Sequence, residues 1–170
     1  ELINDNQIIE ASNPTTILKA IKNDVEIKNI KLAHIKDGLA FTKFMYYVKN
    51  MHIPSESSEI SLTNILEEYR KEQEGFVDIS FDTICAFKDH GAMMHYSATE
   101  QSNYKLKDSG LLLIDSGGHY LEGTTDITRT LAVGKISDTM KLHFTTVLKS
   151  VIALSDAVFL KGCRGTNLDI

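Results

Sequence analysis

The sequence predicts an α+β fold, in which helices come before a block of short strands and another helix follows the block. Three observations predict it. Apolar residues recur at helical spacing over residues 23–49 and 58–75, they alternate with polar residues over 76–81 and 126–133, and helical spacing returns over 137–159. Helices and strands that are segregated along a chain favour a layered α+β structure over alternating βαβ units.

The first helix is predicted from Asn23 to about Lys49. Asn23 and Glu26 have the spacing of a capping box, in which each side chain accepts a hydrogen bond from the other residue's backbone N–H. Residues 1–22 are interpreted as a linker from an upstream domain, with a turn at Asn13-Pro14. Five apolar residues of the helix are expected to face the core: Ile27, Ile30, Ile35, Leu39 and Met45.

The second helix is expected to begin after Ser58, a suitable N-cap, and to end before Gly75. Strands are then expected at residues 76–81 with a continuation over 83–87, at 93–96, at 111–114 and at 126–133. The run 111–114 is wholly apolar and is therefore predicted to be a central strand. The third helix, over residues 137–159, is expected to bury Phe144, Val147, Leu148, Val151, Ile152 and Val158.

The composition of the chain argues against several classes of partner. The net charge is −5 and no block of Lys or Arg is present, so nucleic acid is not expected as a partner. No apolar run approaches the ~20 residues that a membrane span requires, and residues 1–10 lack the features of a signal peptide. We therefore expect a cytoplasmic protein with no membrane association. Cys85 and Cys163 lie far apart and are expected to be free, buried thiols.

Two carboxylates stand on either side of a turn that contains glycine. Asp115 follows the apolar run 111–114, and Asp126 begins the returning strand. In a hairpin, residues at equal distances from the tip come together, so a tip near 121–123 is expected to bring the two aspartates close to each other. Gly117-Gly118 can host a bulge that adjusts the offset.

One face of the returning strand carries oxygen-bearing side chains. The strand period places Asp126, Thr128 and Thr130 on the same face. Two converging carboxylates repel each other, and a cation between them relieves the repulsion. Oxygen ligands favour manganese or magnesium, and an added imidazole widens the choice to manganese, cobalt, zinc or iron. The residues alone leave a second interpretation open, in which each aspartate is a turn residue that caps its own backbone.

The stretch Asp115 to Thr130 reads Asp-Ser-Gly-Gly-His-Tyr-Leu-Glu-Gly-Thr-Thr-Asp-Ile-Thr-Arg-Thr. It resembles the first signature of the pita-bread metallopeptidases, the family of aminopeptidase P, prolidase and methionine aminopeptidase. The similarity is greatest to the cytosolic, three-domain Xaa-Pro aminopeptidases, and it covers nearly all of the chain from Leu18 onward. Further blocks resemble that subgroup in the same order: residues 18–23, 33–37, 76–81, 91–96, 147–149, and Gly165 with 168–169.

The resemblance implies a role for each matching residue. Asp115 matches a carboxylate that chelates one metal of a two-metal pair, and Asp126 matches the carboxylate that bridges both metals. His95 matches a histidine that contacts the substrate without binding metal. Thr128, on the same strand face as Asp126, is expected to support the metal ligands rather than to bind metal. The expected cofactors are two divalent metal ions, manganese first, with cobalt or zinc as alternatives.

The implied activity is removal of the N-terminal residue from peptides that have proline in second position. In this family a hydroxide that bridges the two metals attacks the scissile carbonyl. The family uses three more ligands, a histidine and two glutamates from later motifs that this chain does not contain. Residues 23–170 are therefore interpreted as a truncated catalytic domain, the first half of the pita-bread fold plus the opening helix of the second half. The fragment alone is expected to be inactive, and the full-length protein is expected to be a homodimer.

Two other functions stay open. A prolidase-type dipeptidase shares the same signature, and some pita-bread proteins have lost their metal ligands and act as binding modules. Both Asp115 and Asp126 are present here, which favours an enzyme over a metal-free module. One position departs from the subgroup, because His90-Gly91 replaces the usual Asn-Gly. His90 is interpreted either as a turn residue or as an extra polar group at the rim of the pocket.

Overall fold

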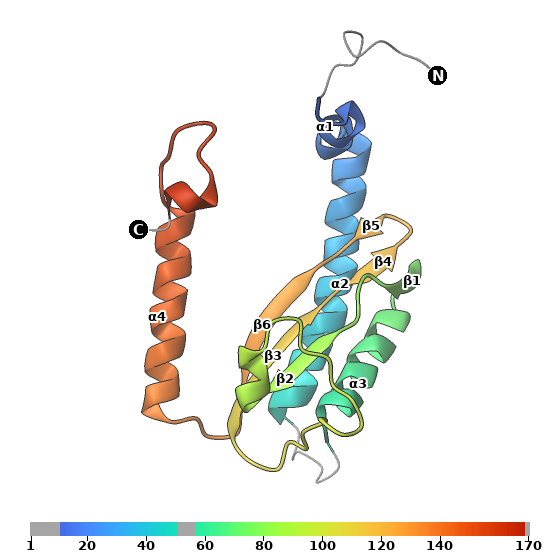
Figure 1. Ribbon diagram of the computed structural model, residues 1–170. Helices are drawn as coiled ribbons and strands as arrows, with labels where there is room; N and C mark the ends of the chain where they lie inside the picture. The colour runs from blue at the N-terminus through green and yellow to red at the C-terminus, as the bar shows by residue number, and fades with distance from the viewer. Residues whose placement is uncertain (1–10, 51–56, 169–170) are drawn as a thin grey trace, which may run out of the picture.

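The computed structural model describes residues 11–50 and 57–168, and the predicted α+β class is confirmed (Figure 1). Within these ranges, none of the helices has the length and apolar composition of a membrane span. The elements in chain order are α1 (Pro14–Ala20), α2 (Asp24–Asn50), α3 (Glu59–Lys71), β1 (Phe76–Ile79), β2 (Ile84–Phe87), the 3-10 helix η2 (Lys88–Ala92), β3 (Gly110–Ser116), β4 (Gly118–Tyr120), β5 (Gly123–Thr124), β6 (Ile127–Val133), α4 (Asp138–Ser155) and the 3-10 helix η3 (Gly165–Asn167).

The strands form two three-stranded antiparallel sheets. β3 is central in the first and pairs with β2 and β6, which confirms the predicted central strand. β4 is central in the second and pairs with β1 and β5. The chain leaves β3 for β4 and returns from β5 to β6, so one bent hairpin contributes to both sheets (Figure 1). Residues 83–87 were expected to continue the strand at 76–81, but β1 and β2 belong to different sheets.

Helices α2 and α3 pack on one face of the sheet β2-β3-β6 and form the main core with it. Burial of each large apolar side chain there contributes roughly 1.5–3 kcal/mol. Along β3, burial alternates so that Leu112, Ile114 and Ser116 face the helices. Asp115 therefore faces the opposite, open side of the sheet. The core side chains include Phe41, Phe44, Leu62, Leu66, Leu112, Ile114, Leu131 and Val133.

Two predicted helix starts are confirmed by their caps. The Asn23 Oδ1 atom accepts the Glu26 N–H at 2.9 Å, and the Glu26 carboxylate accepts the Asn23 N–H at 2.8 Å. The Ser58 hydroxyl caps α3 by accepting the Ser61 N–H, and the Ser61 hydroxyl in turn accepts the Ser58 N–H. These reciprocal bonds satisfy backbone donors that a helix start leaves unpaired.

The predicted apolar stripe of α2 is wrong for Ile27, Ile35 and Leu39, whereas Met45 is half-buried and packs against the core. Ile35 and Leu39 are 69% and 51% exposed, whereas the helix buries Ala33, Asp37, Ala40, Phe41, Phe44 and Val48. This second stripe has helical spacing as well, but a charged residue, Asp37, lies in its middle. Apolar periodicity alone therefore favoured the wrong face.

Two local predictions also differ from the structure. Asn13-Pro14 does not form an isolated turn; Asn13 caps α1 by accepting the Thr15 N–H at 3.0 Å, and proline occupies the first helical position, where it needs no N–H. Residues 93–96 do not form a strand. They follow η2 as irregular chain, and His95 has a positive φ of 54°, which is incompatible with an extended strand.

Helix α4 is predicted over residues 137–159 and spans Asp138–Ser155, with Ser137 as its N-cap, but its predicted buried face is exposed. Phe144, Val147, Leu148, Val151 and Ile152 are 44–63% exposed, and Val158 is fully exposed beyond the helix end. Among the described residues, no element packs closely against that side of α4 (Figure 1). The cysteines are free, as expected, but only Cys85 is buried, and Cys163 is exposed.

Candidate metal-binding site

The two signature aspartates lie where β3 ends and β6 begins. β3 and β6 pair antiparallel in a register that places Asp115 opposite Thr128. The Thr128 hydroxyl donates a hydrogen bond to Asp115 Oδ1 at 2.8 Å. Both residues lie on the open face of the sheet, away from α2 and α3, because the residues that alternate with them on β3 and β6 face the core.

Asp126 lies near Asp115, and its protonation reflects this. Desolvation and, second, the charge of the neighbouring Asp115 carboxylate raise the pKa of the Asp126 carboxyl above its usual value. Such a shift is what two carboxylates show when they approach each other without a counter-charge. The structure therefore brings together three of the predicted site residues: Asp115, Asp126 and Thr128.

Gly117 lets the two arms of the bent hairpin cross at close range. A Cβ atom at this position would lie 2.0 Å from the Thr125 carbonyl oxygen and 2.4 Å from Ser80 Oγ. The same Thr125 oxygen accepts the Ser80 hydroxyl at 2.9 Å, and the Thr125 hydroxyl accepts the Gly118 N–H at 2.9 Å. This packing fixes the residue before Asp126 against the residues that follow Asp115.

A buried ion pair supports the site from the core side of the sheet. The Arg70 side chain is fully buried, and its Nε atom donates to Asp37 Oδ1 at 2.7 Å. Arg70 Nη2 also donates to the hydroxyl of Ser116, the neighbour of Asp115, at 3.0 Å. The Tyr120 hydroxyl donates to Asp37 at 3.0 Å, and burial raises the pKa of Tyr120. This cluster thus ties α2 and α3 to the end of β3.

Sequence reasoning missed this cluster. The available signals were Asp37 in the middle of a second helical stripe on α2 and Arg70 one turn after Leu66 on α3. Each residue alone resembles an ordinary solvated charge, and only the packing of α2 against α3 shows that they pair.

His95, among the residues that the structure describes, makes no contact through which it could hold either aspartate in place. It is exposed, and within residues 11–50 and 57–168 no hydrogen bond or ion pair joins it to Asp115 or Asp126. His90, interpreted above as a turn or rim residue, is instead buried, with Nδ1 2.8 Å from Glu59 Oε1. His90 does lie in the turn of η2, but the rim alternative is wrong, because α3 supplies a buried carboxylate under the turn.

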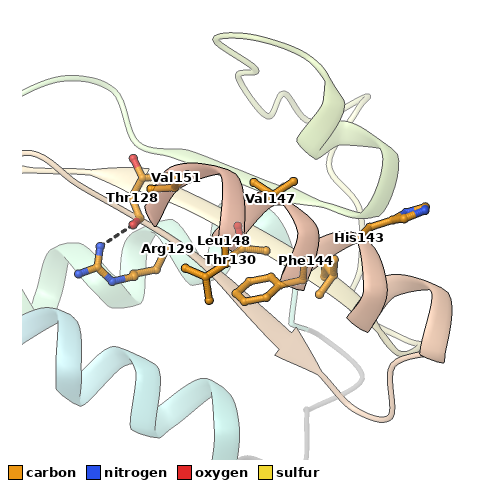
Figure 2. A pocket seen from close by; sticks show the side chains of 9 residues that line it. Thr128, Arg129, Thr130, His143, Phe144, Val147, Leu148 and Val151 are labelled. Carbon is orange, nitrogen blue, oxygen red and sulfur yellow. Dashed lines mark hydrogen bonds between the residues drawn. The ribbon is translucent and has the colours of Figure 1, made fainter. Parts of the chain in front are cut away.

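An apolar pocket begins beside Thr128 on the open face of the sheet (Figure 2). Its volume is about 390 Å³, and it lies between β3 and β6 on one side and α4 on the other. Arg129 lines it and donates from Nη1 to the Thr128 carbonyl at 2.7 Å. The remaining lining residues are Leu111, Thr130, His143, Phe144, Val147, Leu148 and Val151.

The donor set of the site is partial. Among the residues that the structure describes, no group of three or more His, Cys, Asp or Glu side chains is arranged to hold a metal ion. Asp115 and Asp126 supply carboxylate oxygens, the donors that hard divalent ions prefer. Two such ligands suit a divalent ion in chemistry but are fewer than a complete site requires.

The family of the chain follows from a comparison of its sequence with family models. Residues 28–170 match the model of metallopeptidase family M24. The chain belongs to metallopeptidase family M24. Curated M24 relatives named probable Xaa-Pro aminopeptidase P include one from Paracoccidioides brasiliensis, 38% identical over 166 residues, and one from Aspergillus flavus, 39% identical over 168 residues. The matches cover 96% and 98% of this chain but 27% and 26% of the relatives, so the chain spans about a quarter of their length.

Solved structures of M24 enzymes show the same fold. The X-prolyl aminopeptidase of Caenorhabditis elegans, described as a cytosolic enzyme with a di-nuclear active site, superposes with a TM-score of 0.85 at 34% identity over 98% of this chain and 27% of its own. The prolidase of Pyrococcus furiosus superposes with a TM-score of 0.67 at 26% identity over 79% of this chain and 37% of its own. The predicted pita-bread fold is confirmed.

Proposed function

We propose that this chain is the part of an M24 Xaa-Pro aminopeptidase that supplies two carboxylate ligands, Asp115 and Asp126, to a two-metal site. The observation that supports it most is the approach of these two carboxylates on the open face of the sheet, within a chain of this family. The relatives named Xaa-Pro aminopeptidase P and the di-nuclear site ascribed to the C. elegans enzyme support the same function.

In this proposal each residue has a separate task. Asp115 would hold one ion and Asp126 would be a ligand to both, while Thr128 keeps one Asp115 oxygen oriented through its 2.8 Å hydrogen bond. His95 contacts the peptide. When bound, two divalent ions supply a nucleophile at neutral pH and polarise the scissile carbonyl. Manganese is the proposed metal, with cobalt or zinc as alternatives, because carboxylate-rich sites suit hard ions.

We propose further that the enzyme is cytosolic and homodimeric. The description of the C. elegans enzyme as cytosolic supports the location. A prolidase-type dipeptidase is the second candidate, supported by the similarity to the P. furiosus prolidase. A metal-free binding module is a weaker third candidate, because both signature carboxylates are retained.

A kinetic comparison tests the function. In a longer chain that extends these residues through the later motifs, we expect manganese-dependent release of the first residue from Xaa-Pro-Xaa tripeptides and longer peptides. A chelator should abolish the activity and added manganese should restore it, and matched Xaa-Ala peptides should be poor substrates. The isolated 170-residue chain should show no cleavage, because its ligand set is partial.

Other outcomes would overturn the proposal in different ways. Cleavage of Xaa-Pro dipeptides alone would identify a prolidase. Absence of cleavage by a longer chain that binds no metal would identify a binding module. Cleavage by the isolated chain would show that two carboxylates suffice, contrary to the proposed ligand set.

A further inference from the structure

Glu59 is a buried carboxylate that the proposed metal site does not use. Its side chain is fully buried at the first turn of α3, where both oxygens accept two hydrogen bonds each. Oε1 accepts the Phe87 N–H at 2.7 Å and lies 2.8 Å from His90 Nδ1. Oε2 accepts the Tyr96 hydroxyl at 2.8 Å and the Tyr104 N–H at 2.9 Å. Because an unpaired buried charge is costly, these partners together stabilise the carboxylate in the interior.

The segment that Glu59 holds is bounded by two strained residues. Lys88 has a φ of 58° and His95 a φ of 54°, and among the described residues these are the non-glycine residues with positive φ. Lys88 directly follows Phe87, and His95 directly precedes Tyr96. The two positions that Glu59 anchors therefore lie just outside the two residues in left-handed conformation. Such conformations persist only where the surrounding structure determines them, and they are frequent at functional sites.

Ring stacking completes the attachment of this segment. The His90 ring stacks on Tyr104 with centroids 3.6 Å apart, and it lies 4.3 Å from the Tyr96 ring. The Tyr96 ring is buried, whereas the neighbouring His95 is exposed. His95 is thus a solvent-facing imidazole on a backbone that is fixed at the next residue.

We infer that Glu59 and Tyr96 are positioning residues for His95. The hydrogen bond from the Tyr96 hydroxyl to Glu59 holds His95 in its left-handed conformation and so sets where the imidazole meets the peptide substrate. The role of His95 in this inference rests on the proposed function. The effect of Tyr96 and Glu59 on the backbone conformation of His95 does not depend on that function. It assigns to α3 a part in catalysis that is independent of the metal ligands, because no metal ligand belongs to this cluster.

The substitution Tyr96→Phe tests the inference with little risk to folding. It removes only the hydroxyl and keeps the ring that packs beside His90, whereas removal of Glu59 would leave its buried donors unsatisfied. In the longer active enzyme we expect kcat/KM for Xaa-Pro peptides to fall about tenfold or more, with manganese content unchanged, because small misplacements of a catalytic group are costly. In a His95→Ala background, Tyr96→Phe should have no further effect on kcat/KM.

Tyr104→Phe is the matched control. It also removes one hydroxyl from the cluster, but that hydroxyl bonds the exposed Asp89 at 3.2 Å, and the link of Tyr104 to Glu59 is through its backbone N–H. This variant should keep wild-type kcat/KM. Equal losses from Tyr96→Phe with and without His95, or no loss at all, would overturn the inference.

A crystal structure of the Tyr96→Phe variant separates this inference from the proposed function. We expect the φ of His95 to leave the left-handed region, while it stays there in the Tyr104→Phe variant. A His95 backbone that is unchanged in Tyr96→Phe would refute the positioning role, even if the wild-type protein proved to have a different substrate. If the φ of His95 leaves the left-handed region in Tyr96→Phe while the wild-type enzyme shows no Xaa-Pro activity, the positioning effect is upheld and the proposed function is rejected.

Discussion

Replacing Gly117 with alanine is expected to disable the paired-carboxylate site. The new Cβ atom would lie 2.0 Å from the Thr125 carbonyl oxygen, a distance that no rotamer change can relieve because the neighbour is backbone. The segment between β5 and β6 that contains Asp126 must therefore move away from Asp115. Since a displacement of about 1 Å costs on the order of 10²-fold in rate, kcat/KM of the longer enzyme should fall by at least ~10²-fold.

Gly38→Ala provides the control for this substitution. A Cβ atom on Gly38 meets no atom within 4 Å, and the residue lies inside α2. Alanine there should leave activity unchanged and raise the free energy of unfolding by up to about 1 kcal/mol, because glycine is a poor helix former. If Gly117→Ala kept both kcat/KM and manganese affinity, the close crossing of the two arms would not be what sets the spacing of the aspartates.

The substitution Arg70→Met is expected to have the largest effect on stability. It leaves the Asp37 carboxylate buried, with only the Tyr120 hydroxyl of its side-chain partners in place. Removal of one partner from a buried pair typically costs about 3–5 kcal/mol, because an uncompensated charge stays in the interior. Urea unfolding of Arg70→Met against the wild-type protein measures this cost directly.

Lys43→Met is the matched control for Arg70→Met. Lys43 forms an ion pair of the same length with Glu72, 2.7 Å, but both side chains are about half exposed. An exposed pair contributes roughly 0–1 kcal/mol, so this variant should unfold close to the wild-type midpoint. Similar losses of stability in the two variants would contradict the structural role given to Arg70.

The sequence was sufficient where the physical signal is local. The caps at Asn23 and Ser58 depend on residues three positions apart, and the central strand depends on an uninterrupted apolar run. The approach of Asp115 and Asp126 followed from their distances to one hairpin tip. Each of these inferences needs only neighbouring residues.

The sequence was insufficient where a distant partner decides the outcome. Asp37, Arg70 and Glu59 are buried charges, and their burial is possible only because another element supplies the opposite charge or the donors. The burial of His90 was not predicted for the same reason, since its partner is a carboxylate on α3. The apolar face of α4 has helical spacing, but among the described residues it borders an open pocket instead of packing closely on another element. Periodicity therefore predicted an amphipathic helix without showing its exposure.

The central proposal is that Asp115 and Asp126 hold the same pair of ions. Calorimetric titration of the metal-free longer enzyme with manganese tests it most directly, with the variants Asp115→Asn and Asp126→Asn beside the wild type. We expect two bound ions per wild-type chain, weakened binding of both in Asp126→Asn because this residue bridges them, and weakened binding of one in Asp115→Asn. Two ions bound with wild-type affinity by the Asp126→Asn variant would contradict the proposal.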